Sequence, residues 1–204
     1  MSLVIAIKEN NRIYLGCDSQ VTSGGTRTTL QNQNNYKVWK VNGTDHCIMA
    51  SVGNFRDACV VRTMFDLVTD YDVYKKRVNF DFVVNSVVPE IIERLKEAHY
   101  IADSGVFMGM DSSWLFAYED KLFEIASDGS VLEIEDFVAI GSGKKEAIGS
   151  LLSTNGQEPE KRIITAIKAG AASDIYVDYP IIITDTKKTA FKVITEETEK
   201  KFTK

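Results

Sequence analysis

The sequence is poor in the residue types that build disulfides, zinc sites and histidine-based catalytic centres. Its 204 residues include three Cys and two His, and no two Cys form a CxxC pair. An odd number of Cys without such a pair indicates a reduced, cytoplasmic protein with no thiolate metal site. His46 and His99 lie far apart, and their surroundings supply neither a Ser-His-Asp triad nor a zinc motif.

The chain also lacks a surplus of basic charge and any long apolar run. Its net charge of −5 and pI of about 5.2 argue against nucleic acid as a partner. The apolar runs are too short to span a membrane, and Lys8, Glu9 and Arg12 interrupt the first one, so no signal peptide is expected. At 44% hydrophobic and 26% charged residues, the composition is typical of a globular protein, and we expect one domain over residues 1–204.

The sequence contains no nucleotide-binding or cofactor motif, although "AIGSGKKEA" at residues 139–147 resembles one. A phosphate loop would need Gly at the position of Val138 and Ser or Thr at the position of Lys145. The dinucleotide-binding pattern fails too, because Glu146 replaces its last Gly. We therefore expect no cofactor and interpret this segment as a tight turn between a strand and a helix.

Apolar and alternating runs predict strands in three blocks along the chain. Asn10-Asn11 and Asn42-Gly43 are typical of hairpin turns, because Asn and Gly tolerate a positive φ. Residues 19–35 are polar and contain Gly, so a loop is expected there. The expected strands cover residues 3–9, 12–18, 36–41, 46–53, 105–110, 113–120, 121–127, 131–136 running towards 137–140, 180–184 and 190–195.

Helical periodicity begins after Asn54, which is a plausible N-cap for a first helix. A second helix is expected over residues 80–101, with a kink or break at Pro89. Two further helices are expected over residues 143–154 and 158–172. Because strand blocks and helix pairs are segregated, the order favours an α+β fold. We expect two antiparallel sheets face to face with a helix pair outside each, a four-layer αββα sandwich.

The residues around the first predicted hairpin suggest a catalytic centre. Ser2 directly precedes the first strand, and it is small enough for Met1 to be trimmed by the ordinary aminopeptidase. A hydroxyl on a first residue can be activated by its own α-amino group if a cation, a carboxylate and an oxyanion donor lie nearby. Asp18 ends the partner strand, Lys37 opens the next hairpin, and Gly53 stands at a strand-to-helix junction. These residues predict an amino-terminal nucleophile.

This constellation resembles the proteasome β-subunit family of N-terminal nucleophile hydrolases, and within it the bacterial proteasome-like peptidases that work beneath a AAA+ unfoldase. The resemblance spans about residues 2–185, and the 16-residue step from Ser2 to Asp18 matches the family. The order and spacing of its segments carry the likeness. The segments are "RIYLGCDSQVTSGG", "YKVWKV", "ASVGNFRDA", "FVAIGSGKKEAIGSLL" and "AASDIYVDYP".

The resemblance implies an N-terminal-nucleophile fold and a role for each candidate residue. Ser2 corresponds to the nucleophile, Asp18 to the carboxylate that holds the lysine, and Lys37 to that lysine. Gly53 corresponds to the oxyanion N–H donor, and Ser142 to the serine that orients the amino group. A further Asp near the end of the last helix is implied. Asp174 and Asp178 both lie close, and Asp174 is preferred.

The resemblance also implies an endopeptidase subunit of a homo-oligomeric ring that admits unfolded polypeptides, with a AAA+ unfoldase as a partner. The sequence departs from the family in carrying Ser instead of the usual Thr as the nucleophile, and in a longer loop between Asp18 and Lys37. Phe55 and Lys144 replace smaller residues and are expected to narrow the substrate pocket. Two alternatives stay open: a catalytically inactive ring or scaffold subunit, and a hydrolase of small amides.

Overall fold

The structure is a computed structural model that describes residues 2–41, 46–64, 78–98, 109–188 and 190–198. Two five-stranded antiparallel sheets form its centre. The first sheet has the order β10 (Phe137–Gly141), β1 (Leu3–Glu9), β2 (Arg12–Cys17), β11 (Ile181–Asp185) and β12 (Lys192–Ile194). The second has the order β5 (Val38–Lys40), β6 (Cys47–Gly53), β7 (Ser112–Tyr118), β8 (Lys121–Ile125) and β9 (Val131–Glu133).

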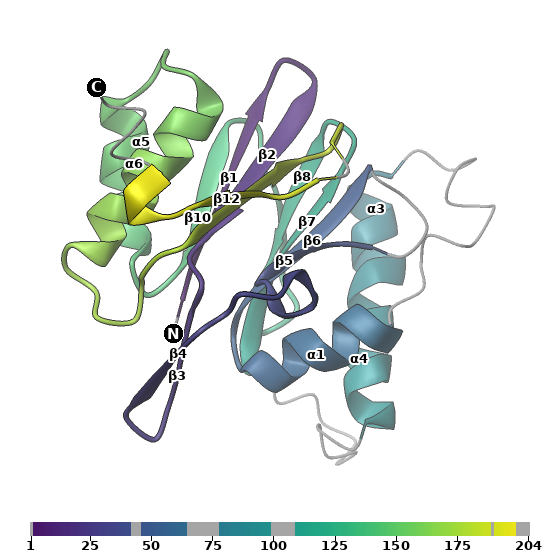
Figure 1. Ribbon diagram of the computed structural model, residues 1–204. Helices are drawn as coiled ribbons and strands as arrows, with labels where there is room; N and C mark the ends of the chain where they lie inside the picture. The colour runs from purple at the N-terminus through teal and green to yellow at the C-terminus, as the bar shows by residue number, and fades with distance from the viewer. Residues whose placement is uncertain (1, 42–45, 65–77, 99–108, 189, 199–204) are drawn as a thin grey trace.

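Helices cover the outer face of each sheet, so the predicted four-layer αββα order is confirmed (Figure 1). The first sheet is covered by α5 (Lys144–Ser153) and α6 (Pro159–Ala171). The second is covered by α1 (Phe55–Met64) and by a continuous helical stretch. That stretch consists of α3 (Phe80–Phe82), the π-helical turn η2 (Val83–Val87) and α4 (Val88–Glu97).

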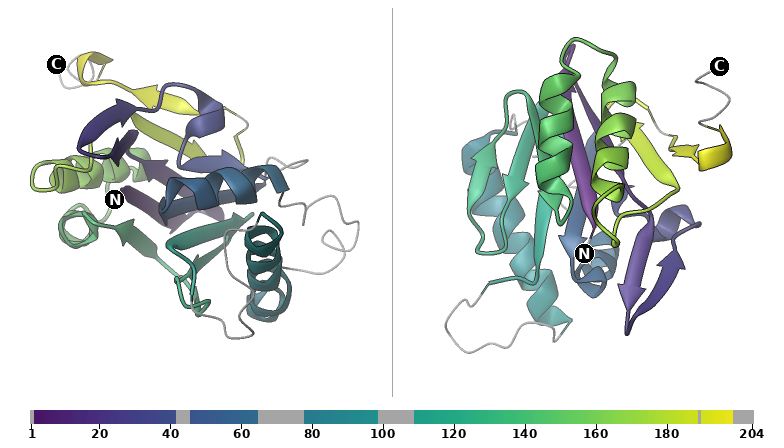
Figure 2. Two further views of the ribbon diagram at one scale, coloured as in Figure 1. Left: turned by 90° about the horizontal axis from the view of Figure 1, so that it is seen from below. Right: turned by 90° about the vertical axis from the view of Figure 1, so that its left-hand side faces the viewer.

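Three apolar clusters fill the spaces between these layers. Strand β1 contributes to two of them, because successive side chains of a strand point to opposite faces. Val4 and Ala6 pack between the two sheets, while Leu3 and Ile5 pack beneath α5 and α6. A strand buried on both faces has to be apolar throughout. This explains the unbroken run at the start of the chain, and Figure 2 shows β1 lying centrally beneath the α5–α6 pair.

Several local predictions are confirmed. Asn10 and Asn11 both have positive φ, 55° and 54°, in the β1–β2 turn. The Asn54 side chain caps α1 by accepting the Arg56 N–H at 3.0 Å. The irregularity expected at Pro89 takes the form of η2, which ends two residues before the proline, a residue that cannot donate a helical hydrogen bond. The second helix ends at Glu97.

The prediction of a loop over residues 19–35 is wrong. Strands β3 (Gln20–Ser23) and β4 (Thr26–Thr29) form a hairpin that projects from the sheets, followed by the short helix η1 (Gln33–Asn35) (Figure 1). Thr-rich segments suit strands even when they are exposed. Gly24 and Gly25 supply the two positive φ angles, 55° and 79°, that a tight hairpin turn requires. The prediction failed because it inferred a loop from the polarity of the segment alone.

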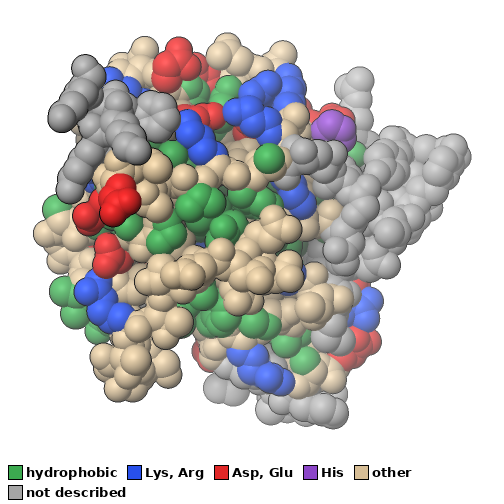
Figure 3. Space-filling view, in the orientation of Figure 1, with side chains coloured by type: hydrophobic (Ala, Val, Ile, Leu, Met, Phe, Trp, Pro, Cys, Tyr) green, Lys and Arg blue, Asp and Glu red, His purple; other side chains and the backbone are tan. Residues whose placement is uncertain are grey.

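The predicted strand over residues 131–136, running towards 137–140, is also corrected. Only Val131–Glu133 forms β9, and the chain then crosses to the other sheet as β10. The turn at Asn42-Gly43, His99 and most of the strand predicted over residues 105–110 lie outside the described residues. On the face shown in Figure 3, hydrophobic side chains gather near the centre, with basic and acidic side chains around them.

Candidate active site

Asp18 fixes the start of β1, next to Ser2. Its N–H donates to the Leu3 carbonyl at 3.2 Å, and the Leu3 N–H donates to Asp18 Oδ1 at 2.9 Å. The Gln20 N–H binds the second carboxylate oxygen, Oδ2, at 3.0 Å. With three backbone hydrogen bonds and no solvent exposure, Asp18 cannot move independently of the β1–β2 hairpin. The backbone of Ser2 is thereby held at a defined place.

Lys37 lies immediately before β5 and reaches the same carboxylate. Its Nζ lies 2.7 Å from Asp18 Oδ1 and 2.5 Å from the Gln20 carbonyl oxygen, and its side chain is only 3% exposed. Burial raises the pKa of the Asp18 carboxyl above its ordinary value, and the adjacent Lys37 ammonium opposes this rise. Because one carboxylate binds both Leu3 and Lys37, a buried positive charge is placed beside the start of the first strand.

The Gly141-Ser142 turn holds Ser2 from another side. The Ser142 N–H donates to the Ser2 carbonyl oxygen at 2.9 Å, and the Ser142 hydroxyl lies 3.4 Å from the same oxygen. Gly141 has a φ of 109°, and a Cβ atom there would lie 1.9 Å from that oxygen. Glycine is therefore required at this position, and the turn packs directly against the backbone of Ser2.

Gly53 ends β6 shortly before α1. The residues that follow Gly53 are held by hydrogen bonds to Ser112 that the sequence did not reveal. Ser112 accepts the Asn54 N–H at 3.1 Å and donates its hydroxyl hydrogen to Asp57 Oδ2 at 2.7 Å. Burial raises the pKa of the Asp57 carboxyl, and the Ser112 hydrogen bond opposes the rise. Only the β6–β7 pairing joins Ser112 to this site, so no local sequence pattern could have identified it.

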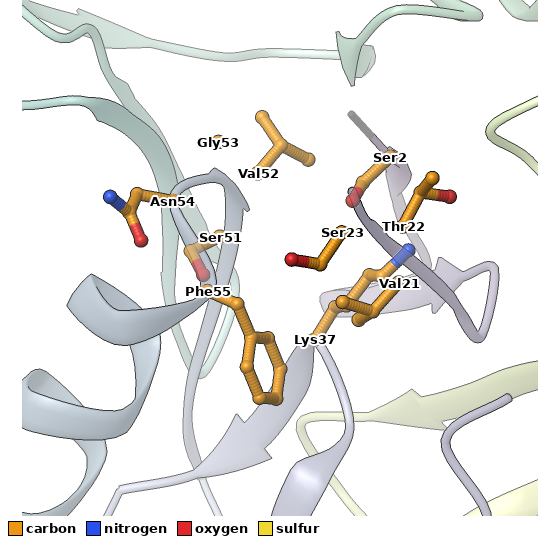
Figure 4. Close-up of a pocket in the computed structure, with 10 residues that line it drawn as sticks. All are labelled: Ser2, Val21, Thr22, Ser23, Lys37, Ser51, Val52, Gly53, Asn54 and Phe55. Carbon is orange, nitrogen blue, oxygen red and sulfur yellow. The ribbon is translucent and has the colours of Figure 1, made fainter. Parts of the chain in front are cut away.

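A cavity of about 250 Å³ brings three of the predicted residues together (Figure 4). Ser2, Lys37 and Gly53 all line it, and Figure 4 shows the Ser2 hydroxyl and the Lys37 ammonium both directed into it. Phe55 forms part of the wall, as expected. Lys144, expected to narrow the pocket as well, begins α5 and is not among the residues that line this cavity.

Asp174 and Asp178 lie in the turn region after α6, in different environments. Asp174 Oδ1 accepts the Tyr176 N–H at 2.9 Å, while its Oδ2 is buried and has no hydrogen-bond partner among the described residues. Asp178 forms an ion pair with Arg27 at 2.9 Å, and its side chain is 45% exposed. Neither carboxylate lines the cavity beside Ser2.

Comparison with protein-family models shows the family to which the chain belongs. The family model for proteasome subunits matches residues 2–172. The chain belongs to the proteasome subunit family. The match contains Ser2, Asp18, Lys37, Gly53 and Ser142, whereas Asp174 and Asp178 lie beyond its end. A search of curated proteins finds no significant match.

Several solved structures have a similar fold. BPH from Thiobacillus denitrificans has a TM-score of 0.71 at 18% identity, with 95% of this chain and 99% of that chain covered. HslV from Trypanosoma brucei has a TM-score of 0.63 at 18% identity, with coverages of 90% and 98%. Anbu, described as an ancestral beta-subunit, from Yersinia bercovieri has a TM-score of 0.71 at 14% identity, with coverages of 98% and 90%. At these identities the likeness establishes the fold.

Within the described residues, no group of three or more His, Cys, Asp and Glu side chains is placed to hold a metal ion. None of the described helices is both long enough and apolar enough to cross a membrane.

Proposed function

We propose that the chain is an N-terminal-nucleophile endopeptidase subunit in which Ser2, exposed by removal of Met1, attacks the peptide carbonyl. The observation that carries this proposal is the buried Lys37–Asp18 ion pair, at 2.7 Å, tied to the backbone of Leu3. A buried ammonium beside a hydroxyl favours the ionised form of that hydroxyl. Burying a charge pair is costly, and this pair lies where it would serve an N-terminal nucleophile.

In the proposed reaction, the Ser2 hydroxyl proton passes to the α-amino group as the oxygen forms a bond to the carbonyl carbon. The tetrahedral oxyanion accepts the Gly53 N–H, and Lys37 provides positive charge close to the nucleophile. The C–N bond then breaks as the α-ammonium gives its proton to the leaving nitrogen. Water hydrolyses the resulting ester by the reverse proton movements, which releases the acid and restores the Ser2 hydroxyl.

Two other residues position the reacting groups in this proposal. Ser142 holds the Ser2 backbone through its N–H and thereby orients the amino group. We assign the further supporting carboxylate to Asp174, because its buried Oδ2 has no partner among the described residues whereas Asp178 is half exposed and already paired with Arg27. Serine in place of threonine lacks the methyl group that restricts the hydroxyl rotamer, so slower turnover is expected.

We further propose that the subunit works in a homo-oligomeric ring in the cytoplasm, where enclosed sites act on unfolded polypeptides supplied by a AAA+ unfoldase. Membership of the proteasome subunit family supports the ring. The small cavity beside Ser2 admits one side chain of an extended chain, which fits an unfolded substrate better than a folded one.

The test combines the mature N-terminus with peptide cleavage. Intact mass spectrometry is expected to show Ser2 as the first residue, and Ser2→Ala is expected to lower kcat/KM on fluorogenic peptides at least about a thousandfold. Ser153→Ala, on the exposed surface of α5, is the matched serine control and should keep its activity. Retained Met1 together with equal rates for wild type and Ser2→Ala would reject the proposal and favour the inactive ring subunit. Faster hydrolysis of small acylated amides than of peptides would favour the small-amide hydrolase.

A further inference from the structure

A second cavity, of about 470 Å³, also borders Ser2. It shares Ser2, Val52 and Gly53 with the first cavity, so the nucleophile and the candidate oxyanion donor lie at the boundary between the two. The remaining lining residues differ completely from those of the first cavity. They are Met110, Asp111, Ser112, Ser113, Ser127, Gly141 and Ser142.

The proposed function indicates which part of a peptide would enter each cavity. In the tetrahedral intermediate, the carbon bound to Ser2 has its oxyanion at Gly53. The residue before the scissile bond lies on one side of this carbon, and the leaving nitrogen lies on the other. The leaving nitrogen must receive its proton from the Ser2 amino group. The Ser2 backbone, which carries that group, is held by Ser142, and Ser142 lines only the second of these two cavities. The leaving side of the substrate therefore belongs in the second cavity.

The two cavities differ in charge as well as in position. Lys37 is the charged residue among those that line the first cavity, and Asp111 is the charged residue among those that line the second. Asp111 is exposed and forms no ion pair with any of the described residues. Its backbone is fixed close to the reaction centre, since a Cβ atom on Gly53 would lie 2.3 Å from the Asp111 carbonyl oxygen.

Two of the serine hydroxyl groups in this cavity already bind other groups, and Asp111 is the charged side chain in its lining. Ser112 donates its hydroxyl hydrogen to Asp57, and the Ser142 hydroxyl lies against the Ser2 carbonyl. We propose that the second cavity is the subsite for the residue that follows the scissile bond, and that Asp111 makes this subsite selective for Lys or Arg. The inference rests on the proposed function and adds to it a preference on the leaving side.

The test uses internally quenched peptides that differ only at the residue after the scissile bond. Lys is compared with norleucine, and Glu with Gln, so that each pair changes charge at similar size. We expect kcat/KM to be about fivefold higher for Lys than for norleucine, as for an exposed ion pair of about 1 kcal/mol. Glu should be disfavoured against Gln. Both ratios should shrink at high ionic strength, because the carboxylate is exposed.

Variants of Asp111 separate this subsite from the general activity. Asp111→Asn should remove the Lys preference, and Asp111→Lys should reverse it in favour of Glu. Both variants should still cleave a peptide with a neutral aminomethylcoumarin leaving group, since no charged residue then enters the second cavity. Asp136→Asn, an exposed carboxylate on the connection between β9 and β10, is the matched control and should keep the wild-type ratio.

The possible results distinguish a failure of the proposed subsite from a failure of the proposed function. Cleavage by the wild type with equal rates for Lys and norleucine would overturn the subsite while leaving the endopeptidase in place. An unchanged Lys preference in Asp111→Asn would overturn the role of Asp111. A wild-type protein with Ser2 at its terminus that cleaves none of the peptides would overturn the proposed function, and the subsite with it.

Discussion

Replacing Lys37 with Met tests the buried ion pair that holds the candidate site together. The change removes a charge 2.7 Å from Asp18 and keeps a side chain of similar length. Asp18 retains its hydrogen bonds from the N–H groups of Leu3 and Gln20 but loses its only cationic partner among the described residues. Leaving one partner of a buried pair uncompensated typically costs about 3–5 kcal/mol in free energy of unfolding. We expect a loss of this size at pH 8.

The loss should depend on pH in a defined direction. Burial already raises the pKa of Asp18 above its ordinary value of 3.8, and removing Lys37 removes the main opposing interaction, so the pKa rises further. A carboxyl whose pKa is higher in the folded state binds protons more readily when folded. Its penalty is therefore complete above the folded-state pKa and disappears as the pH falls towards 3.8. The difference between variant and wild type should shrink by up to about 1.4 kcal/mol per pH unit within that window.

Urea denaturation followed by the fluorescence of the buried Trp39 and Trp114 measures the effect, at fixed protein concentration and at pH 5 and pH 8. Lys121→Met removes a half-buried lysine whose ion pair with Glu133 spans 3.6 Å, and should cost less than about 1 kcal/mol. The double variant Lys37→Met/Asp18→Asn removes both charges and should recover much of the stability. A loss below about 1 kcal/mol for Lys37→Met at pH 8, or the same loss at both pH values, would refute the reasoning.

Two further predictions concern the Ser2 turn and the cysteines. Gly141→Ala should lower the free energy of unfolding by at least about 2 kcal/mol, because its Cβ atom would lie 1.9 Å from the Ser2 carbonyl oxygen at a φ of 109°. Gly149→Ala, in α5 with open space around the added atom, should stabilise by about 1 kcal/mol; equal thermal shifts for the two variants would contradict this. At pH 8, iodoacetamide should label the exposed Cys59 of the native protein but not Cys17, because burial raises the pKa of Cys17 to about 12. Peptide mapping that finds both labelled at similar rates would contradict the burial of Cys17.

The sequence was informative where the site depends on local chain geometry. Ser2 and Asp18 lie at the open end of one hairpin, and a turn at Asn10-Asn11 is enough to bring them together. Lys37 immediately precedes the next strand pair, so three candidate residues could be placed before any long-range pairing was known. The four layers followed from segregated strand and helix blocks, because apolar faces have few ways to be buried. That residues 1–204 form one domain stays a prediction.

Long-range pairing accounts for what the sequence could not reveal. Ser112 and Asp111 reach Gly53 only because β7 pairs with β6 across more than 50 residues of chain. The choice between Asp174 and Asp178 was undecidable from spacing, whereas their burial and partners distinguish them. The β3–β4 hairpin escaped prediction because its side chains are mostly polar and exposed, which removes the apolar alternation that identifies a strand.

Leu3 explains how a site at the chain terminus can be rigid. Its backbone binds Asp18 through two hydrogen bonds and pairs with Gly141, and its side chain is completely buried beneath α5 and α6. The fit there is tight, since a Cβ atom on Gly170 would lie 2.6 Å from Leu3 Cδ2. A first strand is ordinarily free to fray, but this one is anchored in the core one residue after Ser2. Core packing would therefore fix the position of Ser2 in the catalytic site. Substitutions in the core beneath α6 should disturb the geometry of the site although they do not contact it.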